Sequence, residues 1–367
     1  MPLYMDIHFV NEVSVEDTRK AHLADLAVQE KYGVKYLQYW FNEKAGTIFC
    51  LMEAPDKESC AATHREANGI SACQIVEVEG GLYDIFMGEN QKLDHGLVRH
   101  EDGMIDTGNR YILTLDILAN TQISETVEYD QLKLPKQSKK KALEIIDECN
   151  GKEVRTAGFD CIIAVFKSPE KILRCAHEIK KELLKSNAGP AELRDDVTFN
   201  MGISVGQPLT EKEGFFEKAI QASRRLCIIG SDQEIITSRL FEEICDANDV
   251  MKKHISFRTL KPSEQAFLDN LLDITESRLV DFEFGVDCLS KEIGFSKPQL
   301  YRRVTAITGR SPVNFIRDLR MNKALSLIKE NKYNISQIAL EVGYNNPSYF
   351  SKCFQEKFGI NPSKIAI

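Results

Sequence analysis

The chain has 367 residues, of which 43% are hydrophobic and 28% charged, and its formal net charge at pH 7 is −8. This length exceeds the size at which single hydrophobic cores stop growing, so we expect two or three domains. No apolar run approaches the roughly 18 residues that a membrane-spanning helix needs, and no secretory signal opens the chain, so we expect a cytoplasmic protein that does not enter a membrane. Ten cysteines without a Cys-x-x-Cys pair indicate reduced thiols rather than a disulfide framework.

Charge is distributed unevenly along the chain. Residues 290–367 hold 13 Lys and Arg against five Asp and Glu, a net charge of +8, which leaves −16 for the rest. Phosphate binding favours a basic surface, and an acidic body discourages nonspecific contact with nucleic acid. The distribution therefore predicts a small basic module that binds DNA, attached to an acidic body.

The first segment, residues 1–86, alternates strand and helix patterns. "LYMDIHFV" has strand alternation, Ser14 is a plausible N-cap for a helix that Gly33 stops, and a second helix runs from Asp56 to Gly69. "VKYLQYWF" and "TIFCLMEA" flank a tight turn at residues 43–46, which indicates a hairpin, and "CQIVEVE" is a final strand. A βαββαβ order in fewer than 90 residues predicts a ferredoxin-like sandwich.

Potential metal ligands lie in this first segment. Asp6 and His8 share one face of the first strand because side chains alternate, and the first and third strands of a ferredoxin-like sheet are neighbours. His8 could therefore meet Cys50, and imidazole with thiolate suits nickel, copper or zinc. The alternative is that these histidines are ordinary core or surface residues.

The segments "MDIH", "AHLADLAVQEKYGVKYLQYWFNEKAGTIFCLMEAPD" and "THREANG" give residues 1–78 a resemblance to a small ferredoxin-like family of nickel-binding proteins. The resemblance implies binding of nickel or another divalent transition metal through His8, Cys50 and His64. Asn68 stands where relatives often have a second histidine on that helix. Dimerisation and small-molecule sensing are the alternative roles of this domain.

A polar stretch at residues 88–108 is expected as a linker to a middle α+β domain at residues 109–246. Its strands and helices are expected in "RYILTLDIL", "KKALEIIDEC", "GFDCIIAVF", "PEKILRCAHEIKKELLK", "VTFNMGISVGQ", "FFEKAIQASRRL" and "QEIITS". Asp116 and Asp160 lie on two of the strands, where two carboxylates could hold divalent cations for phosphoryl chemistry. Gln221 precedes Arg225 by four residues, a spacing that could contact ribose and triphosphate.

This pattern resembles the class III nucleotidyl cyclase fold, whose Asn-x-x-x-Arg pair would fall at Gln221 and Arg225. The glycines that normally flank the second metal aspartate are Phe159 and Cys161, and side chains there would crowd a phosphate. We therefore expect a cyclase-like domain that has lost turnover and serves in structure, in dimerisation or in ligand binding. Because class III catalysis needs two chains, the resemblance also implies a homodimer.

The third segment, residues 262–367, is expected to be all-helical and contains an internal repeat. "EIGFSKPQLYRRVTAITGRSP" and "EVGYNNPSYFSKCFQEKFGINP" follow one another at an offset of 49–50 residues, joined by the helix "VNFIRDLRMNKALSLIKE". Each unit has a glycine turn, an N-cap followed by proline, and a second helix, which predicts tandem helix-turn-helix units. A helical bundle with a solvated basic face is the alternative.

The second helix of each unit carries candidate DNA contacts near its start. Arg and Lys favour guanine and Gln favours adenine in the major groove. The residues expected to read bases are Lys297, Gln299, Arg302, Ser348, Ser351, Lys352 and Gln355. The residues expected to bind phosphates are Arg303, Arg310, Arg317 and Lys357.

From Phe267 onward the chain resembles the AraC/XylS family of transcription regulators, over "LSKEIGFSKPQLYRRVTAITGRSPVNFIRDLRMNKALSLI" and "ISQIALEVGYNNPSYFSKCFQEKFGINPSKI". The resemblance implies that both units contact successive major grooves of a double-stranded promoter. It also implies a contact with RNA polymerase if the protein activates. The sequence thus predicts a regulator, not an enzyme, whose two N-terminal domains sense a ligand or dimerise. The alternatives are a DNA-tethered cyclase and a protein that stores or delivers metal.

Overall fold

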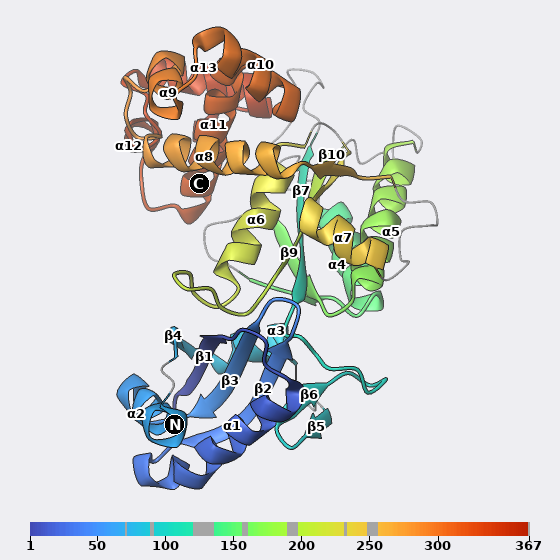
Figure 1. The fold of residues 1–367 in the computed structure, drawn as a ribbon. Coiled ribbons are helices and arrows are strands. Elements are labelled where there is room, and N and C mark those ends of the chain that lie inside the picture. Colours follow the sequence, from blue (N-terminus) through green and yellow to red (C-terminus); the bar gives the residue numbers. More distant parts are fainter. Residues whose placement is uncertain are drawn as a thin grey trace.

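The structure, a computed structural model, describes residues 1–69, 72–88, 92–119, 136–155, 161–188, 197–230, 233–247 and 256–365. Three units follow one another in space as they do in the chain, with two mixed sheets below an all-helical domain (Figure 1). The predicted α+β multidomain class is confirmed. Among the described residues, no helix combines the length and apolar character that crossing a bilayer requires.

The N-terminal unit is a sheet covered on one face by two helices. Side chains cap both helices: the Ser14 side chain accepts from the backbone N–H of Asp17 at the start of α1, and Asp56 caps α2. The elements are β1 Leu3–Phe9, α1 Val15–Val28, η1 Gln29–Tyr32, β2 Lys35–Asn42, β3 Thr47–Glu53, α2 Lys57–Asn68, β4 Gln74–Val78, α3 Gly80–Phe86, β5 Lys92–Asp94 and β6 Leu97–Arg99. The strand order is β4-β1-β3-β2-β6-β5, so residues 92–99, within the stretch expected as a linker, extend the sheet instead.

The middle unit is a second six-stranded sheet in the order β12-β11-β10-β7-β9-β8. Gly202 of β10 allows α6 to approach closely, because a Cβ there would lie 2.0 Å from the carbonyl oxygen of Ser223. The elements are β7 Arg110–Ala119, α4 Lys136–Glu148, β8 Lys152–Glu153, β9 Ile162–Phe166, α5 Pro169–Asn187, β10 Val197–Gly206, α6 Glu217–Ile228, β11 Ile235–Ser238, α7 Arg239–Ala247 and β12 Arg258–Leu260.

The C-terminal unit is helical throughout. Its elements are α8 Pro262–Ser277, α9 Val286–Ile293, α10 Lys297–Thr308, α11 Pro312–Glu330, α12 Ile335–Glu341, α13 Pro347–Phe358 and η4 Pro362–Lys364. The pairs α9–α10 and α12–α13 are the two expected helix-turn-helix units, and α11 connects them. Gly309 and Gly359 end α10 and α13 in the left-handed conformation, at φ 68° and 71°.

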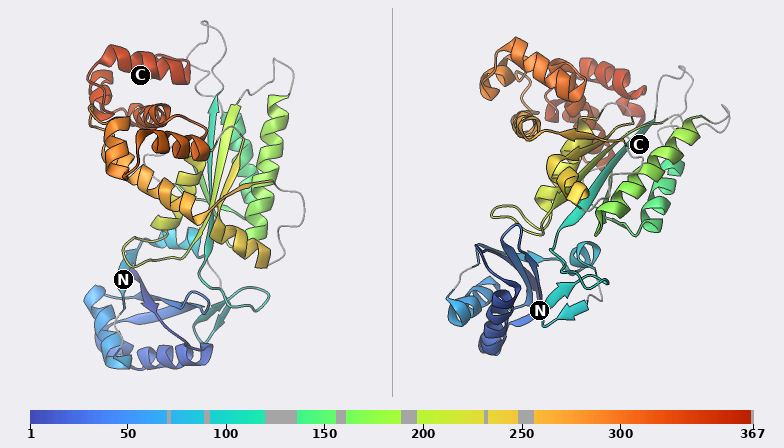
Figure 2. Two further views of the ribbon diagram at one scale, coloured as in Figure 1. Left: turned by 45° about the horizontal axis from the view of Figure 1, so that its top comes forward. Right: turned by 45° about the vertical axis from the view of Figure 1, so that its right-hand side comes forward.

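Continuous apolar cores join the three units. Met5 and Ile7 of β1 point away from α1 and α2 and share a buried core with Ile112 and Ile163 of the middle sheet. Leu226 at the end of α6 shares another core with α8, α9 and α10. Figure 2 shows α1 and α2 on the face of the N-terminal sheet that is turned away from the middle unit. The face of the N-terminal sheet opposite α1 and α2 is therefore buried against the middle unit.

Candidate functional site

The first helix-turn-helix presents the start of α10 to solvent. Lys297, Gln299 and Arg302 are all exposed, whereas Leu300 and Val304 are buried in the core. This alternation follows the helical period, because every third or fourth residue turns inward. All three residues expected to read bases from this helix are therefore accessible to solvent.

These three side chains differ in how they are already engaged. The Lys297 ammonium lies 2.7 Å from Asp287 of α9. The Gln299 side-chain oxygen accepts from the backbone N–H of Ser296 at 3.0 Å, which makes it a capping-box residue. Arg302 makes no ion pair within the described part of the chain. Of the three residues, Arg302 is thus the one whose charge is not paired among the described residues.

The second helix-turn-helix repeats this arrangement in α13. The Asn346 side chain caps the helix by accepting from the backbone N–H groups of Ser348 and Tyr349. The Ser351 hydroxyl donates to the carbonyl oxygen of Pro347 at 2.9 Å, so it is turned back on the helix. Lys352 and Gln355 are exposed, and neither side chain has a partner among the residues that the structure describes.

The cations expected to bind phosphate also make contacts within the protein. The Arg303 guanidinium lies 4.4 Å from the ring centroid of Phe295, within reach of a cation–π interaction. Lys357 donates to the carbonyl oxygen of Asp318 at 3.1 Å, and burial lowers its pKa. Arg310 donates to the carbonyl oxygen of Gly230 in the middle unit at 3.0 Å. Lys357 and Arg310 are thus engaged within the protein, whereas Arg303 remains exposed beside Phe295.

A buried polar cluster lies between the N-terminal sheet and α2. Asp6 and His8 project from β1 and His64 projects from α2, with their ligand atoms all within 4.8 Å of one another. His64 Nε2 donates to Asp6 Oδ2 at 2.5 Å, and His64 Nδ1 donates to Asp25 Oδ1 at 3.2 Å. His8 Nε2 lies 3.4 Å from Asp6 Oδ2, while His8 Nδ1 is buried without a hydrogen-bond partner in the described structure.

Electrostatics in this cluster favour a charged His64 between two carboxylates. Burial alone would lower the pKa of His64, but Asp6 and Asp25 outweigh it and raise that pKa to about 10. Burial likewise opposes ionisation of Asp6, yet His8 and His64 hold its pKa well below the usual range. These shifts favour a protonated His64 at neutral pH, with one ring N–H directed at Asp6 and the other at Asp25.

Cys50, expected as a metal ligand, is outside this cluster. It pairs with Asp6 across β1 and β3, and its backbone N–H donates to Asp6 Oδ1 at 3.1 Å. Burial raises the pKa of the Cys50 thiol well above the ordinary value, and the Asp6 carboxylate adds to the shift. The ligand atoms that lie within 4.8 Å of one another are those of a carboxylate and two imidazoles.

That donor set fits a divalent transition metal. Two ligand atoms that each lie about 2 Å from one ion are at most about 4 Å apart, close to the separations present. Imidazole and carboxylate together suit nickel, zinc, copper or iron. The resemblance did not assign Asp6 to the site, although Asp6 was expected on the same strand face as His8, and the sequence analysis did not name Asp25. Alternation with His8 marks the first, but only the packing of α1 on α2 reveals the second.

Three of the four residues expected from the cyclase resemblance are among the described residues. Asp116 lies on β7 opposite Asn200 of β10, whereas Asp160 lies outside the described residues. Gln221 is exposed, while Arg225, one turn later on α6, is buried. Arg225 Nη1 lies 3.0 Å from Asp269 of α8, so this arginine is engaged by the helical domain.

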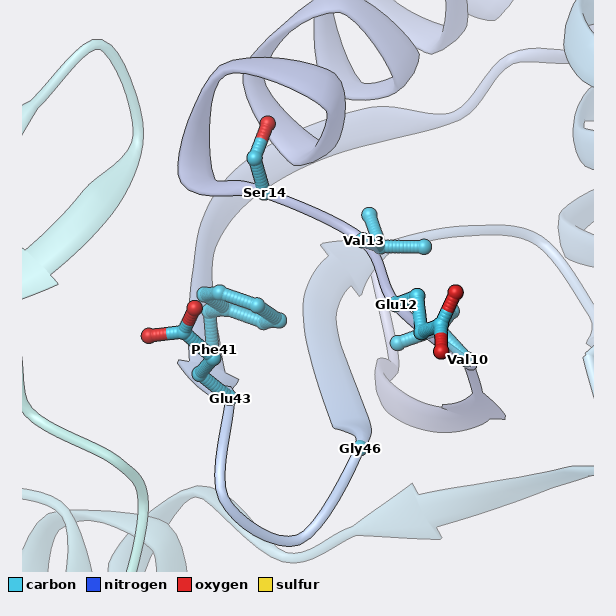
Figure 3. Close-up of a pocket in the computed structure, with 7 residues that line it drawn as sticks. All are labelled: Val10, Glu12, Val13, Ser14, Phe41, Glu43 and Gly46. Atoms are coloured by element: carbon cyan, nitrogen blue, oxygen red, sulfur yellow. The ribbon is translucent and has the colours of Figure 1, made fainter.

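A surface pocket of about 310 Å³ lies beside the N-terminal sheet, between the β1–α1 loop and the β2–β3 turn (Figure 3). Phe41 contributes an apolar wall, and the carboxylates of Glu12 and Glu43 stand at its edge. No sequence-predicted site residue lines it, and it is separate from the histidine cluster.

Two family models match opposite ends of the chain. Residues 4–78 match the model of the nickel responsive protein SCO4226-like family, and residues 289–366 match a helix-turn-helix domain model. The solved structure of SCO4226 from Streptomyces coelicolor is 36% identical over 21% of this chain and 94% of that protein, with a TM-score of 0.20.

Curated relatives and a further structure match other portions. The transcriptional activator RhaS of Mannheimia succiniciproducens is 34% identical over 24% of this chain, and histidine kinase P4 of Formosa agariphila is 39% identical over 30%. This chain spans 33% and 8% of the lengths of those two relatives. An adenylate/guanylate cyclase/hydrolase structure from Silicibacter pomeroyi is 26% identical over 38% of this chain and 80% of that one, with a TM-score of 0.31. The chain therefore carries an SCO4226-like domain at its N-terminus and an AraC-type helix-turn-helix domain at its C-terminus.

Proposed function

We propose that this protein is a sequence-specific transcription regulator that binds promoter DNA through α10 and α13. The observation that carries the proposal is the pair Arg302 and Lys352. Each is the sixth residue of its helix, lies seven residues before the glycine that ends it, and is exposed. Two equivalent cations on two capped helices suit guanines in successive major grooves.

Binding to duplexes recovered by selection with the wild-type full chain tests this proposal. Arg302→Ala and Lys352→Ala should each lower the affinity for the selected duplex by about 1–3 kcal/mol and relax specificity at one position. Lys20→Ala, which removes an exposed lysine from α1, is the matched control and should leave affinity unchanged. Unaltered discrimination between selected and scrambled duplexes in both test variants would overturn the proposal.

We further propose that the N-terminal domain senses nickel or a related divalent ion. Asp6, His8 and His64 would hold the ion, which would act as an effector and supply a charge and a fixed geometry, not a reaction. Calorimetry with nickel chloride should give one tight site in the wild-type chain and at least a tenfold weaker one in Asp6→Asn. The Cys50→Ser variant should bind nickel nearly as well as the wild type, because its thiol is not among the ligand atoms that cluster at the site.

Thermodynamic linkage between nickel binding and DNA binding distinguishes a sensor from a protein that stores metal. A sensor must change its DNA affinity on binding nickel, and DNA must then change the nickel affinity by the same factor. We expect a shift of five-fold or more in both directions. Tight nickel binding with no effect on DNA affinity would instead favour a storage role.

We propose that the middle domain is not a working enzyme, and that the protein acts as a homodimer that contacts RNA polymerase where it activates. The engagement of Arg225 by Asp269 supports the first statement, because it removes this arginine from a nucleotide site. Incubation with ATP or GTP and Mn²⁺ should give no cyclic nucleotide. Product that Asp116→Ala abolishes would identify a DNA-tethered cyclase instead. Sedimentation of the full chain tests the dimer.

A further inference from the structure

Helix α6 contacts both neighbouring domains, one at each end. Its first residue follows Phe216, whose ring stacks on Phe86 of α3 with centroids 4.5 Å apart and planes 13° apart. Its last turns carry Arg225 and Leu226, which meet α8. Figure 1 shows α6 running from the N-terminal junction toward α8. Twelve residues of helix span about 18 Å, so a single rigid element bridges the two junctions.

The beginning of α6 belongs to the core that backs the histidine cluster. Phe216 and Ala219 are buried in the same apolar cluster as Met5 and Ile7 of β1. Those two residues flank Asp6 on the strand, and their side chains leave the opposite face of the sheet. Met5 and Ile7 thus connect the strand that carries Asp6 to the start of α6 through this shared core.

Phe216 also has an unusual backbone conformation. Its φ is 53°, in the left-handed region that bulky residues rarely adopt, and its side chain is 1% exposed. Such a conformation persists only where the surroundings impose it. The Phe216 backbone N–H donates to the carbonyl oxygen of Pro208 at 2.8 Å, and its ring stacks on Phe86, which ties the start of α6 to the N-terminal side of the molecule.

The end of α6 is held by charge. Arg225 lies 3.0 Å from Asp269 and 3.9 Å from Glu276, and it also pairs with Asp273. These three carboxylates stand four and three residues apart and form one stripe of α8. The arginine side chain is only 7% exposed, whereas the carboxylates are 40–64% exposed. Loss of the ion pairs would therefore leave a buried guanidinium charge without a counter-charge.

We propose that α6 is the element that couples the N-terminal domain to the orientation of the DNA-binding domain, with Arg225 and the acidic stripe of α8 as its output contact. This inference rests on the proposed function, since it describes how sensing reaches the DNA-reading helices. It needs no change within either domain. Movement at one end of α6 changes how firmly α8 is held at the other.

Hydrogen exchange measured by mass spectrometry on the metal-free full chain tests the coupling. Arg225→Gln should raise exchange of the α8 amides at least tenfold. Phe216→Leu keeps an apolar side chain but loses the stacking, and it should raise α8 exchange at least threefold although it lies at the far end of α6. In the double variant Phe216→Leu should add nothing further. Lys218→Gln, an exposed position on α6, is the matched control and should leave α8 unchanged.

Two results with these variants would overturn the coupling. The first is unchanged exchange of the α8 amides in Phe216→Leu. The second is an equal effect of Phe216→Leu on α8 exchange in the wild-type and Arg225→Gln backgrounds. Exchange of the α13 amides serves as the internal check that the helical domain stays folded. Arg225→Lys, which keeps the charge, should restore at least part of the protection, whereas a purely space-filling role for the arginine predicts no rescue.

A nickel arm distinguishes this inference from the proposed sensing. Added nickel should alter α8 exchange in the wild type and not in Arg225→Gln. If calorimetry detects no nickel binding, the sensing proposal fails while the metal-free variants still decide the coupling. If nickel binds and leaves wild-type α8 exchange unchanged, the coupling fails while the metal site stands.

Discussion

Raising the pH from 7 to 9 should weaken the N-terminal domain through His64. The pKa of this imidazole is about 10 in the folded protein, against about 6.5 in an unfolded chain. A raised folded pKa contributes stability that is fully present below pH 6.5 and is lost as the pH rises through 10. Each pH unit well between those values removes roughly 1 kcal/mol, so the rise from pH 7 to 9 removes about 2 to 3 kcal/mol.

The chain offers a local probe for this loss. Trp40 is its single tryptophan, and it is fully buried on β2 of the same domain. Urea unfolding followed by tryptophan fluorescence therefore reports on the N-terminal domain. The wild type should lose about 2 to 3 kcal/mol between pH 7 and 9, whereas His64→Gln should be less stable at pH 7 and should have a much flatter pH dependence.

Nuclear magnetic resonance of histidine-labelled protein checks the cause directly. The His64 ring signal, assigned by its absence from His64→Gln, should stay in its protonated position through pH 8. A signal that titrates near 6.5, or equal pH dependence in the wild type and the variant, would refute a cationic His64 held between Asp6 and Asp25.

Three further outcomes follow from described contacts. Nickel binding at pH 7 should release about one proton per ion, because the metal displaces the His64 proton; calorimetry in two buffers of different ionisation enthalpy measures this, and equal heats would contradict it. Gly202→Ala should lower the melting temperature by several degrees or prevent folding, because its Cβ would lie 2.0 Å from the Ser223 carbonyl oxygen. Gly81→Ala is the control for thermal unfolding, because its Cβ would meet nothing within 4 Å. Equal melting temperatures of the two variants would refute the clash. Arg303→Met should cost about 0.5–1 kcal/mol of stability by loss of its cation–π contacts and leave the salt dependence of DNA binding unchanged; a salt slope reduced by about one would instead make it a phosphate contact.

Local chemistry made most elements predictable. Ser14 caps α1 as expected, and Asp56, where the second helix was expected to begin, caps α2. The turn at residues 43–46 joins β2 to β3 as expected. The two helix-turn-helix units were predictable because caps, glycine stops and apolar spacing recur twice. These signals act over a few residues, so a sequence carries them without knowledge of the fold.

Pairings between distant segments were not predictable in the same way. β6 has three residues and joins β2 through a parallel contact, and β12 is equally short, so neither has enough alternation to mark it as a strand. His8 and His64 were foreseen as neighbours in one domain, but whether Cys50 or Asp6 completes their set depends on how α2 lies across the sheet. The partner of Arg225 depends on the docking of two domains, which no local pattern encodes.

The last strand of the middle sheet has a consequence for the DNA that this protein can recognise. β12 ends at Leu260 and α8 begins at Pro262, so one residue separates a hydrogen-bonded sheet edge from the DNA-binding domain. A long flexible tether would let two such domains bind half-sites at many separations, whereas this joint leaves little slack. An operator with two half-sites should therefore require a set helical phase, and insertion of half a turn of DNA between them should abolish joint binding.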